Sequence, residues 1–215
     1  MFCFAMKGML IEKWKALGLA DEKLLTAFRN VPRELFVLER FVSEAYGDYP
    51  LPILSGQTIS QPTTVMVMTA ALELKPGYKV LEVGSGSGYQ AAIIAELVKP
   101  EGKVITVDVI KGLVDFAANN LKKANIKNVE VIHYNGSTGY SKEAPYDRII
   151  VTAAAPTIPK PLLAQLKVGG ILVIPVGPSY TQELLKIRKT AKDKFDIKNL
   201  GDFVFVPLAA AENKR

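Results

Sequence analysis

The sequence has little of the chemistry on which many enzymes depend. Its 215 residues include one cysteine, Cys3, and one histidine, His133. A single cysteine excludes a disulfide within the chain and any metal cluster built on several cysteines. A single histidine excludes a metal site built on several histidines and argues against a Ser-His-Asp triad. We therefore expect a site without a metal ion, whose chemistry needs no histidine base.

Long apolar runs and long runs of like charge are also missing. No stretch approaches the ~20 apolar residues that cross a bilayer, and the apolar opening residues have no basic residue ahead of them, unlike a secretory signal. We expect a cytoplasmic, monomeric protein without a membrane partner. The net charge of +6 comes from scattered lysines, which favours a solvated basic surface over a stable nucleic-acid partner.

Composition and pattern indicate an α/β protein that forms one compact unit in two parts, residues 1–60 and 61–215. Hydrophobic residues make up 49% of the chain, enough for one sizeable core. The first part has helical spacing, with Asp21 as a predicted N-cap, and a further helix is predicted to begin at Pro62. The second part alternates apolar runs with helical stretches, which predicts a doubly wound, mostly parallel sheet.

The expected elements of the second part follow from this alternation. The predicted strands of the parallel sheet are 79–83, 103–107, 129–132, 148–151 and 171–176. The predicted helices between them are 89–98, 112–123 and 159–166. Two more strands, 183–189 and 203–206, have no helix between them and predict a closing antiparallel hairpin.

A glycine loop at residues 84–88 follows directly on the first predicted strand and precedes a helix. This arrangement lets a backbone approach a nucleotide closely. The dinucleotide fingerprint G-x-G-x-x-G would need a glycine at position 89, which is Tyr89 here. The pattern is instead G-x-G-x-G, and the acid Glu82 stands two residues before it.

A second acid, Asp108, follows the next predicted strand. A carboxylate at the tip of the second strand can accept hydrogen bonds from both hydroxyls of a ribose. The alternative interpretation of Asp108 is an N-cap of the helix that follows. Position and chemistry together favour the ribose role.

The stretch from Glu82 to Gly88 resembles the first motif of class I S-adenosylmethionine-dependent methyltransferases. Residues 56–62, Gly-Gln-Thr-Ile-Ser-Gln-Pro, together with residues 80–92 resemble the protein-L-isoaspartate O-methyltransferase family. The blocks 144–156, 165–170, 174–177 and 205–208 resemble later family blocks in the same order. The segment around Ser60 is the most specific of these, whereas many methyltransferases share the glycine loop.

This resemblance implies a Rossmann-like fold and S-adenosylmethionine as cofactor, with S-adenosylhomocysteine as product. Asn135 stands where many members of the family have Asp, and Asn-Gly is also a common turn pair. The resemblance places Asn135 and Gly136 beside the adenine. The cofactor-binding residues that it implies are Glu82, Gly84, Ser85, Gly86, Gly88, Asp108, Asn135 and Gly136.

The implied substrate is a protein or peptide that carries an L-isoaspartyl or D-aspartyl residue. Its free carboxyl group has a pKa near ~3.5 and is already ionised at neutral pH, so no general base is needed. The resemblance assigns Ser60 to orient that carboxylate, although Ser60 could also serve as an N-cap. The implied substrate-binding residues are Thr58, Ile59, Val206, Pro207 and Leu208, the last three of which could equally form an edge strand ending at a proline.

Three other functions remain open at this point. The same fold and cofactor could serve a methyltransferase that acts on RNA or a small metabolite, which the positive charge would support. The chain could be a non-catalytic cofactor-binding or interaction module. A nicotinamide dehydrogenase is the third alternative, and Tyr89 in place of the third glycine argues against it.

Overall fold

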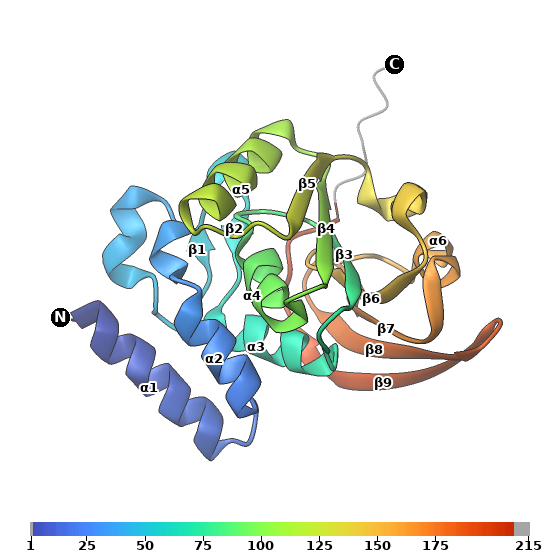
Figure 1. Cartoon of the computed structure of the whole chain (residues 1–215), viewed down its shortest axis with the longest axis horizontal. Helices are drawn as coiled ribbons and strands as arrows, with labels where there is room; N and C mark the ends of the chain where they lie inside the picture. The colour runs from blue at the N-terminus through green and yellow to red at the C-terminus, as the bar shows by residue number, and fades with distance from the viewer. Residues whose placement is uncertain (1, 209–215) are drawn as a thin grey trace.

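A seven-stranded sheet forms the centre of the protein in the computed structural model, which describes residues 2–208, with side chains from residue 5 onward (Figure 1). The strands lie in the order β5-β4-β3-β6-β7-β8-β9. Their bounds are Lys79–Val83 (β3), Lys103–Asp108 (β4), Val129–His133 (β5), Tyr146–Val151 (β6), Leu166–Val176 (β7), Gln182–Ala191 (β8) and Lys194–Phe203 (β9). A separate two-stranded sheet pairs Leu51–Pro52 (β1) with Thr58–Ile59 (β2).

The predicted mostly parallel sheet is confirmed. β3 pairs in parallel with β4 on one side and with β6 on the other, and β5 and β7 extend the parallel part. β7–β8 and β8–β9 are antiparallel. The strand order therefore reverses between β3 and β6, and in open α/β sheets ligands bind at the carboxyl ends of the strands beside such a reversal.

Helices cover both faces of this sheet, as a doubly wound fold requires. One face packs residues of α3, α4 and the strands into a common cluster, whereas the other face packs against α6. The helices are Phe2–Ala16 (α1), Glu22–Asn30 (α2), Pro62–Ala71 (α3), Tyr89–Val98 (α4), Lys111–Lys123 (α5) and Lys160–Ala164 (α6). Short 3-10 turns are η1 (Arg33–Leu35), η2 (Glu39–Glu44), η3 (Leu54–Gly56), η4 (Gly136–Thr138) and η5 (Ser141–Glu143).

The first sixty residues add an outer layer over α4 and α5. α1 and α2 lie on the outside of the molecule in Figure 1, and their apolar faces join those of α4 and α5 in one buried cluster. Asp21 caps α2 as predicted, since its carboxylate accepts a hydrogen bond of 2.8 Å from the backbone N–H of Leu24. At the centre of the cluster Trp14 packs edge-on against Phe28, with ring centroids 4.7 Å apart.

Two predicted elements have different bounds in the structure. The final strand is β9, Lys194–Phe203, and the prediction of a strand at 203–206 was wrong. β9 is the edge strand, and most of its residues are exposed, so it lacks the apolar run by which a buried strand is recognised. The predicted helix 159–166 ends at Ala164, because Leu166 already belongs to β7 and pairs with Tyr146.

A buried arginine at the far end of the sheet fixes the connection from α3 to β3. Arg148, on β6, donates to the backbone carbonyls of Leu72 and Glu73, and its guanidinium lies 4.5 Å from the ring centroid of Tyr78. The Glu73 carboxylate in turn pairs with Arg188 at 2.7 Å and with Lys186 at 2.5 Å on β8. Side chains of β6 and β8 thus tie the end of α3 to the sheet.

We expect the variant Glu73→Gln to lose a pH-dependent part of the free energy of unfolding. Lys186 and Arg188 lower the pKa of Glu73 from 4.5 to about 2, against the opposing effect of burial. The folded state is therefore stabilised relative to the variant above pH 4.5, and this difference disappears as the pH falls toward 2. Urea unfolding of both proteins at several pH values measures it. Glu183→Gln, on the same strand as the two cations, is a control that should show a smaller difference.

Candidate active site

The carboxyl ends of three neighbouring strands meet at one edge of the sheet. Val83 of β3 is in register with Val107 of β4 and with Val151 of β6. Beyond these positions, Gly84 donates a backbone hydrogen bond of 2.8 Å to Val107, and Thr152 donates one of 3.0 Å to Val83. The loops that leave the three strands are thereby held together.

At two of the loop glycines a side chain would collide with neighbouring atoms, whereas at the third it would enter open space. A Cβ at Gly84 would lie 2.4 Å from the Thr152 hydroxyl, and one at Gly88 would lie 3.2 Å from the carbonyl oxygen of Ala117 on α5. The closest atom to a Cβ at Gly86 is Cδ1 of Ile53, 3.8 Å away. Gly84 and Gly88 therefore allow close packing, whereas Gly86 leaves room for a ligand.

Beside this loop lies a buried carboxylate with an unsatisfied oxygen. Glu82 is fully buried, and its Oε2 accepts a hydrogen bond of 2.5 Å from the Thr106 hydroxyl. Its Oε1 has no hydrogen-bond partner. Burial raises the pKa of Glu82 to about 8, and the charge of Asp108 adds to the rise. A buried acceptor without a partner calls for a ligand that donates a hydrogen bond or carries positive charge.

Asp108 stands at the end of β4 with its carboxylate oriented by the glycine loop. Oδ2 accepts hydrogen bonds of 3.1 Å from the backbone of Gly86 and 3.3 Å from the hydroxyl of Ser85. Oδ1 accepts one of 3.0 Å from the backbone of Ile110, just before α5. An ionised carboxylate has about four acceptor positions, so Asp108 both supports the loop and keeps capacity for a ribose hydroxyl.

Asn135 and Gly136 follow β5 at this edge of the sheet, but their surroundings differ. Gly136 lines the cavity beside Asp108, and a Cβ there would lie 2.3 Å from Cγ1 of Val83. The amide oxygen of Asn135 accepts hydrogen bonds from the backbone and hydroxyl of Ser137, at 3.1 and 2.8 Å. The turn interpretation thus describes the side-chain oxygen of Asn135, and Gly136 rather than Asn135 lines the cavity.

Three hollows adjoin one another along this edge, because Thr58 and Thr152 line all of them. A cavity of about 70 Å³ lies over the ends of β3 and β4, bordered by Gly84, Gly86, Asp108 and Gly136. An inner hollow of about 50 Å³ lies between Ser60, Glu82 and the glycine loop. An outer groove of about 660 Å³ begins at Ser60 and continues along residues 202–206.

The short β1–β2 pair carries the predicted substrate residues to the inner hollow. Ser60 follows β2 directly and borders both the inner hollow and the outer groove. The N-cap of α3 is Gln61 rather than Ser60, and Pro62 opens the helix. Ser60 is therefore not engaged as a helix cap, and its position between the two hollows agrees with the predicted orienting role.

The segment after β9 forms the other wall of the groove. Its backbone is anchored at the rim, since Ala154 donates to the carbonyl of Val206 and Leu208 donates to the carbonyl of Ala154, both at 2.8 Å. Val206, Pro207 and Leu208 line the cavity, and Val206 also borders the groove. Thr58 and Val206 thus line both the cavity and the groove, whereas Ile59 lines the inner hollow alone and Pro207 and Leu208 line the cavity alone.

Thr152 was missed by the sequence interpretation. Its hydroxyl donates to the Gly84 carbonyl at 2.7 Å, and the residue borders all three hollows. Its position directly after the predicted strand 148–151 was the available signal. By contrast, His133 is exposed and its Nε2 lies 2.9 Å from the carbonyl oxygen of Val109.

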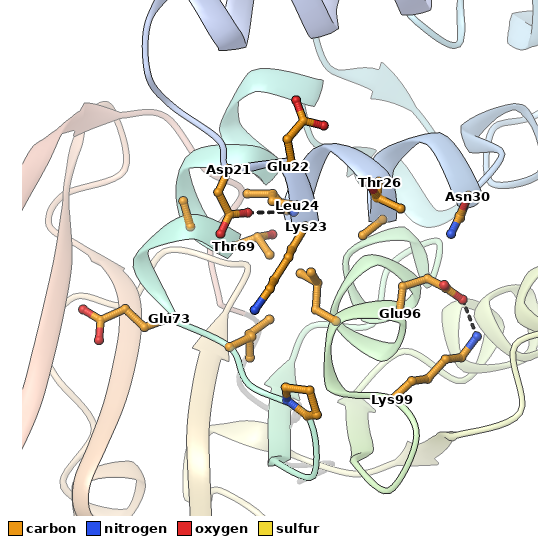
Figure 2. A pocket seen from close by; sticks show the side chains of 15 residues that line it. Asp21, Glu22, Lys23, Leu24, Thr26, Asn30, Thr69, Glu73, Glu96 and Lys99 are labelled. Atoms are coloured by element: carbon orange, nitrogen blue, oxygen red, sulfur yellow. Dashed lines mark hydrogen bonds and ion pairs between the residues drawn. The ribbon is translucent and has the colours of Figure 1, made fainter.

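A separate hollow of about 650 Å³ lies between α2, α3 and α4, where Figure 2 shows its lining side chains. It is bordered by Lys23, Glu73 and the Glu96–Lys99 ion pair, and none of the predicted site residues lines it. Over residues 2–208, no group of three His, Cys, Asp or Glu side chains could hold a metal ion. In the same part of the chain, every helix is too short or too polar to span a bilayer.

The sheet order, the G-x-G-x-G loop and the acid at the end of β4 define a class I S-adenosylmethionine-dependent methyltransferase. Within that class, the sequence model of the protein-L-isoaspartate(D-aspartate) O-methyltransferase family matches residues 5–213. The chain belongs to this family.

Relatives and solved structures agree with this assignment. The protein-L-isoaspartate O-methyltransferase of Methanopyrus kandleri is 51% identical over 205 residues, covering 94% of this chain and 91% of the relative. That of Pyrococcus horikoshii is 51% identical over 208 residues, with 93% and 94% covered. A Plasmodium falciparum structure assigned to the same enzyme, in complex with S-adenosyl-L-homocysteine, has 30% identity and a TM-score of 0.82, with 94% of this chain and 97% of that chain covered.

We expect Gly86→Ala and Gly88→Ala to separate cofactor binding from folding. Both glycines have positive φ, 50° and 85°, so either alanine costs ~1–2 kcal/mol of backbone strain. At Gly86 the added methyl enters open space, and affinity for S-adenosylhomocysteine should fall at least ~10-fold. At Gly88 the added methyl collides with α5, so the free energy of unfolding should fall more for Gly88→Ala than for Gly86→Ala. Calorimetric titration and urea unfolding measure the two effects. Unchanged affinity of Gly86→Ala would remove the loop from the cofactor site.

Proposed function

We propose that this chain transfers a methyl group from S-adenosylmethionine to the free carboxylate of L-isoaspartyl residues, and of D-aspartyl residues, in aged proteins and peptides. The amide nitrogen that links the next residue then attacks the ester carbonyl and displaces methanol, and the succinimide so formed begins the repair. Family membership supports the reaction. The observation that supports it most is the inner hollow, which Ser60, Glu82 and the glycine loop line together.

The residues at the rim fit the cofactor. The unsatisfied Oε1 of Glu82 and the open space at Gly86 suit a positively charged ligand that lies along the loop. Asp108 would bind the ribose hydroxyls, and Gly136 would lie beside the adenine. When bound, S-adenosylmethionine supplies a methyl group bonded to a positively charged sulfur. The proposed cofactor-binding residues are Glu82, Gly84, Ser85, Gly86, Gly88, Asp108, Asn135 and Gly136.

The chain needs only to orient the acceptor. The carboxylate of an isoaspartyl residue arrives ionised, and correct alignment of reacting groups can lower a barrier by roughly 7–11 kcal/mol. Ser60 would donate its hydroxyl to one carboxylate oxygen and leave the other for bond formation. This proposal gives no role to His133, which is exposed and whose Nε2 lies 2.9 Å from the carbonyl oxygen of Val109.

The outer groove would hold the peptide on either side of the damaged residue. The proposed substrate-binding residues are Thr58, Ile59, Val206, Pro207 and Leu208, of which Thr58 and Val206 border the groove and the others border the two hollows beside it. Asp202 is the charged side chain that borders the groove. Since the groove is open and lined mainly by small polar and apolar residues, we propose a broad range of flanking sequences.

The remaining parts of the proposal concern assembly and location. We propose that the enzyme acts as a monomer in the cytoplasm, on protein substrates rather than on a stable nucleic-acid partner. Residues 1–60 would form the part that carries the substrate-side motif, and residues 61–215 the methyltransferase domain. The scattered distribution of the basic residues along the chain supports a protein substrate over a stable nucleic-acid partner.

We expect the protein to methylate an isoaspartyl peptide and to leave the matched aspartyl peptide unmodified. The free α-carboxylate of the isoaspartyl form is absent from the interior of a normal peptide, so the difference in kcat/KM should exceed ~100-fold. Transfer of labelled methyl groups measures it, with an unstructured RNA assayed in parallel. Label found only in the RNA would overturn the proposed function.

The variant Ser60→Ala should lower kcat by ~100-fold to ~1,000-fold, since one positioned donor to a reacting oxygen typically contributes this much. Its affinity for S-adenosylhomocysteine should change less than ~3-fold. Single-turnover methyl transfer and calorimetric titration measure the two quantities. A matched control is Ser141→Ala, an exposed serine of η5 that lines none of the three hollows and that should retain wild-type kcat when changed. Equal kcat in Ser60→Ala and wild type would exclude Ser60 from the reaction.

A further inference from the structure

A buried arginine lies behind the inner hollow and contacts the backbone of Ser60. Arg33, at the start of η1, has no exposed surface. Its Nη2 donates to the carbonyl oxygen of Ser60 at 2.7 Å, and its Nε donates to that of Ala45 at 2.6 Å. Its Nη1 has no hydrogen-bond partner. The guanidinium therefore binds main-chain carbonyls on two separate segments.

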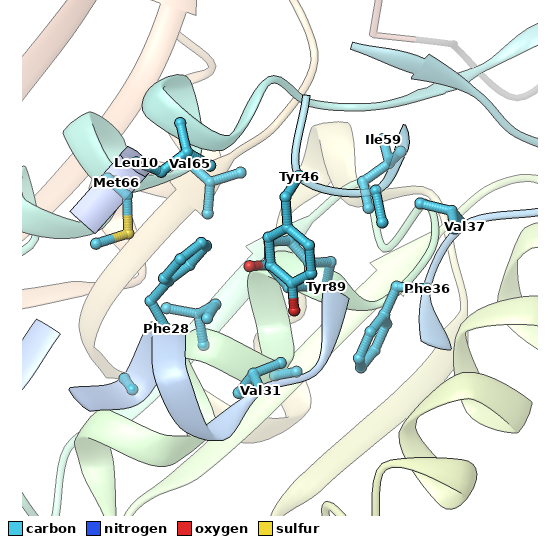
Figure 3. Packing of buried hydrophobic residues seen from close by; sticks show 14 of the residues in the cluster. Leu10, Phe28, Val31, Phe36, Val37, Tyr46, Ile59, Val65, Met66 and Tyr89 are labelled. Carbon is cyan, nitrogen blue, oxygen red and sulfur yellow. The ribbon is translucent and has the colours of Figure 1, made fainter. Parts of the chain in front are cut away.

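The same guanidinium also contacts the cofactor side of the site. Its central carbon lies 4.9 Å from the ring centroid of Tyr89, which is the first residue of α4 after the glycine loop. Tyr89 in turn packs against Phe36, with ring centroids 5.5 Å apart. Both residues belong to the buried cluster drawn in Figure 3. Arg33 thus joins the segment that carries Ser60 to the helix that follows the glycine loop.

Further contacts fix the backbone from which Arg33 extends. The hydroxyl of Tyr46 accepts a hydrogen bond of 3.2 Å from the N–H of Arg33 and donates one of 2.6 Å to the carboxylate of Glu34. Tyr46 itself packs edge-on against Phe28. The arginine is therefore held at both ends and has little freedom to follow a moving Ser60.

Stability alone gives a weak reason for a charge at this position. Within residues 2–208 no carboxylate forms an ion pair with Arg33, and burial lowers its pKa to about 10, so the charge persists at neutral pH. Burial of a charge without an ion-pair partner costs free energy, which its hydrogen bonds must offset. Charge-assisted hydrogen bonds, however, fix a backbone more strongly than neutral ones.

We propose that Arg33 is a positioning residue for methyl transfer: by binding the Ser60 carbonyl and the Tyr89 ring, it sets the position of the Ser60 hydroxyl relative to the glycine loop. This inference rests on the proposed function. Because Arg33 binds the carbonyl and not the hydroxyl, its contact with residue 60 persists when the side chain at that position is changed.

A double-mutant cycle on kcat tests the proposal, with Arg33→Met and Ser60→Ala as the single variants. Arg33→Met fills a similar volume without donors, and we expect kcat to fall by ~10-fold to ~100-fold, as expected for a small displacement of a reacting group. In the Ser60→Ala background the same substitution should lower kcat less than ~2-fold, because the group that Arg33 positions is already gone. Arg33→Lys keeps a donor and should recover part of kcat.

The matched control is Arg148→Met, which removes a buried arginine that also binds carbonyls but at the opposite end of the sheet. Its effect on kcat should be the same in the presence and absence of Ser60. Multiplicative effects of Arg33→Met and Ser60→Ala would overturn the proposal, as would an unchanged kcat. If Arg33→Met does not fold, Arg33→Lys replaces it in the cycle under the same criteria. A wild-type protein inactive on isoaspartyl peptide would overturn the proposed function as well, whereas an active wild type with multiplicative effects overturns only the role of Arg33.

Discussion

Parallel pairing of β3 with β4 on one side and with β6 on the other is the constraint on which the site depends. It brings Val83, Val107 and Val151 into register, so the loops that follow must leave the sheet at the same edge. The glycine loop, Asp108 and Thr152 are then neighbours without any need for long side chains to reach across. Apolar residues pack against both faces of the sheet. A register shift by one residue would move every side chain of a strand to the opposite face, so this packing fixes the register of the strands.

Three buried ionisable groups serve this framework in different ways. Arg148 donates to carbonyls in the connection between α3 and β3, at the edge of the sheet away from the site. Arg33 binds carbonyls behind the inner hollow. Glu82 keeps an oxygen without a partner directly beside the glycine loop. Nη1 of Arg33 also lacks a partner, but Glu82, unlike Arg33, lines the inner hollow, so its free oxygen is the one placed to bind a ligand.

Much of the fold and part of the site follow from local patterns in the sequence. The apolar strands, the G-x-G-x-G loop and the position of Asp108 are set by neighbours within a few residues, and the structure has them where the sequence predicted. β9 was misplaced because an exposed edge strand needs no apolar run. The roles of Arg33 and Thr152 depend on contacts with Ser60 and Gly84, residues far away in the chain. The position of Thr152 directly after a predicted strand places it at the edge of the sheet, but its hydrogen bond to Gly84 and the contact of Arg33 with Ser60 are visible only in the folded chain.

The hydrogen bonds from the Ser85 hydroxyl and the Gly86 backbone to Asp108 have a consequence for the affinity with which a ligand binds. The glycine loop, despite three residues with positive φ, is tied to β4 before anything arrives. An incoming nucleoside therefore meets a finished surface and loses little affinity to the ordering of loose chain. The binding surface is therefore largely preformed, and the loop does not have to fold around the ligand.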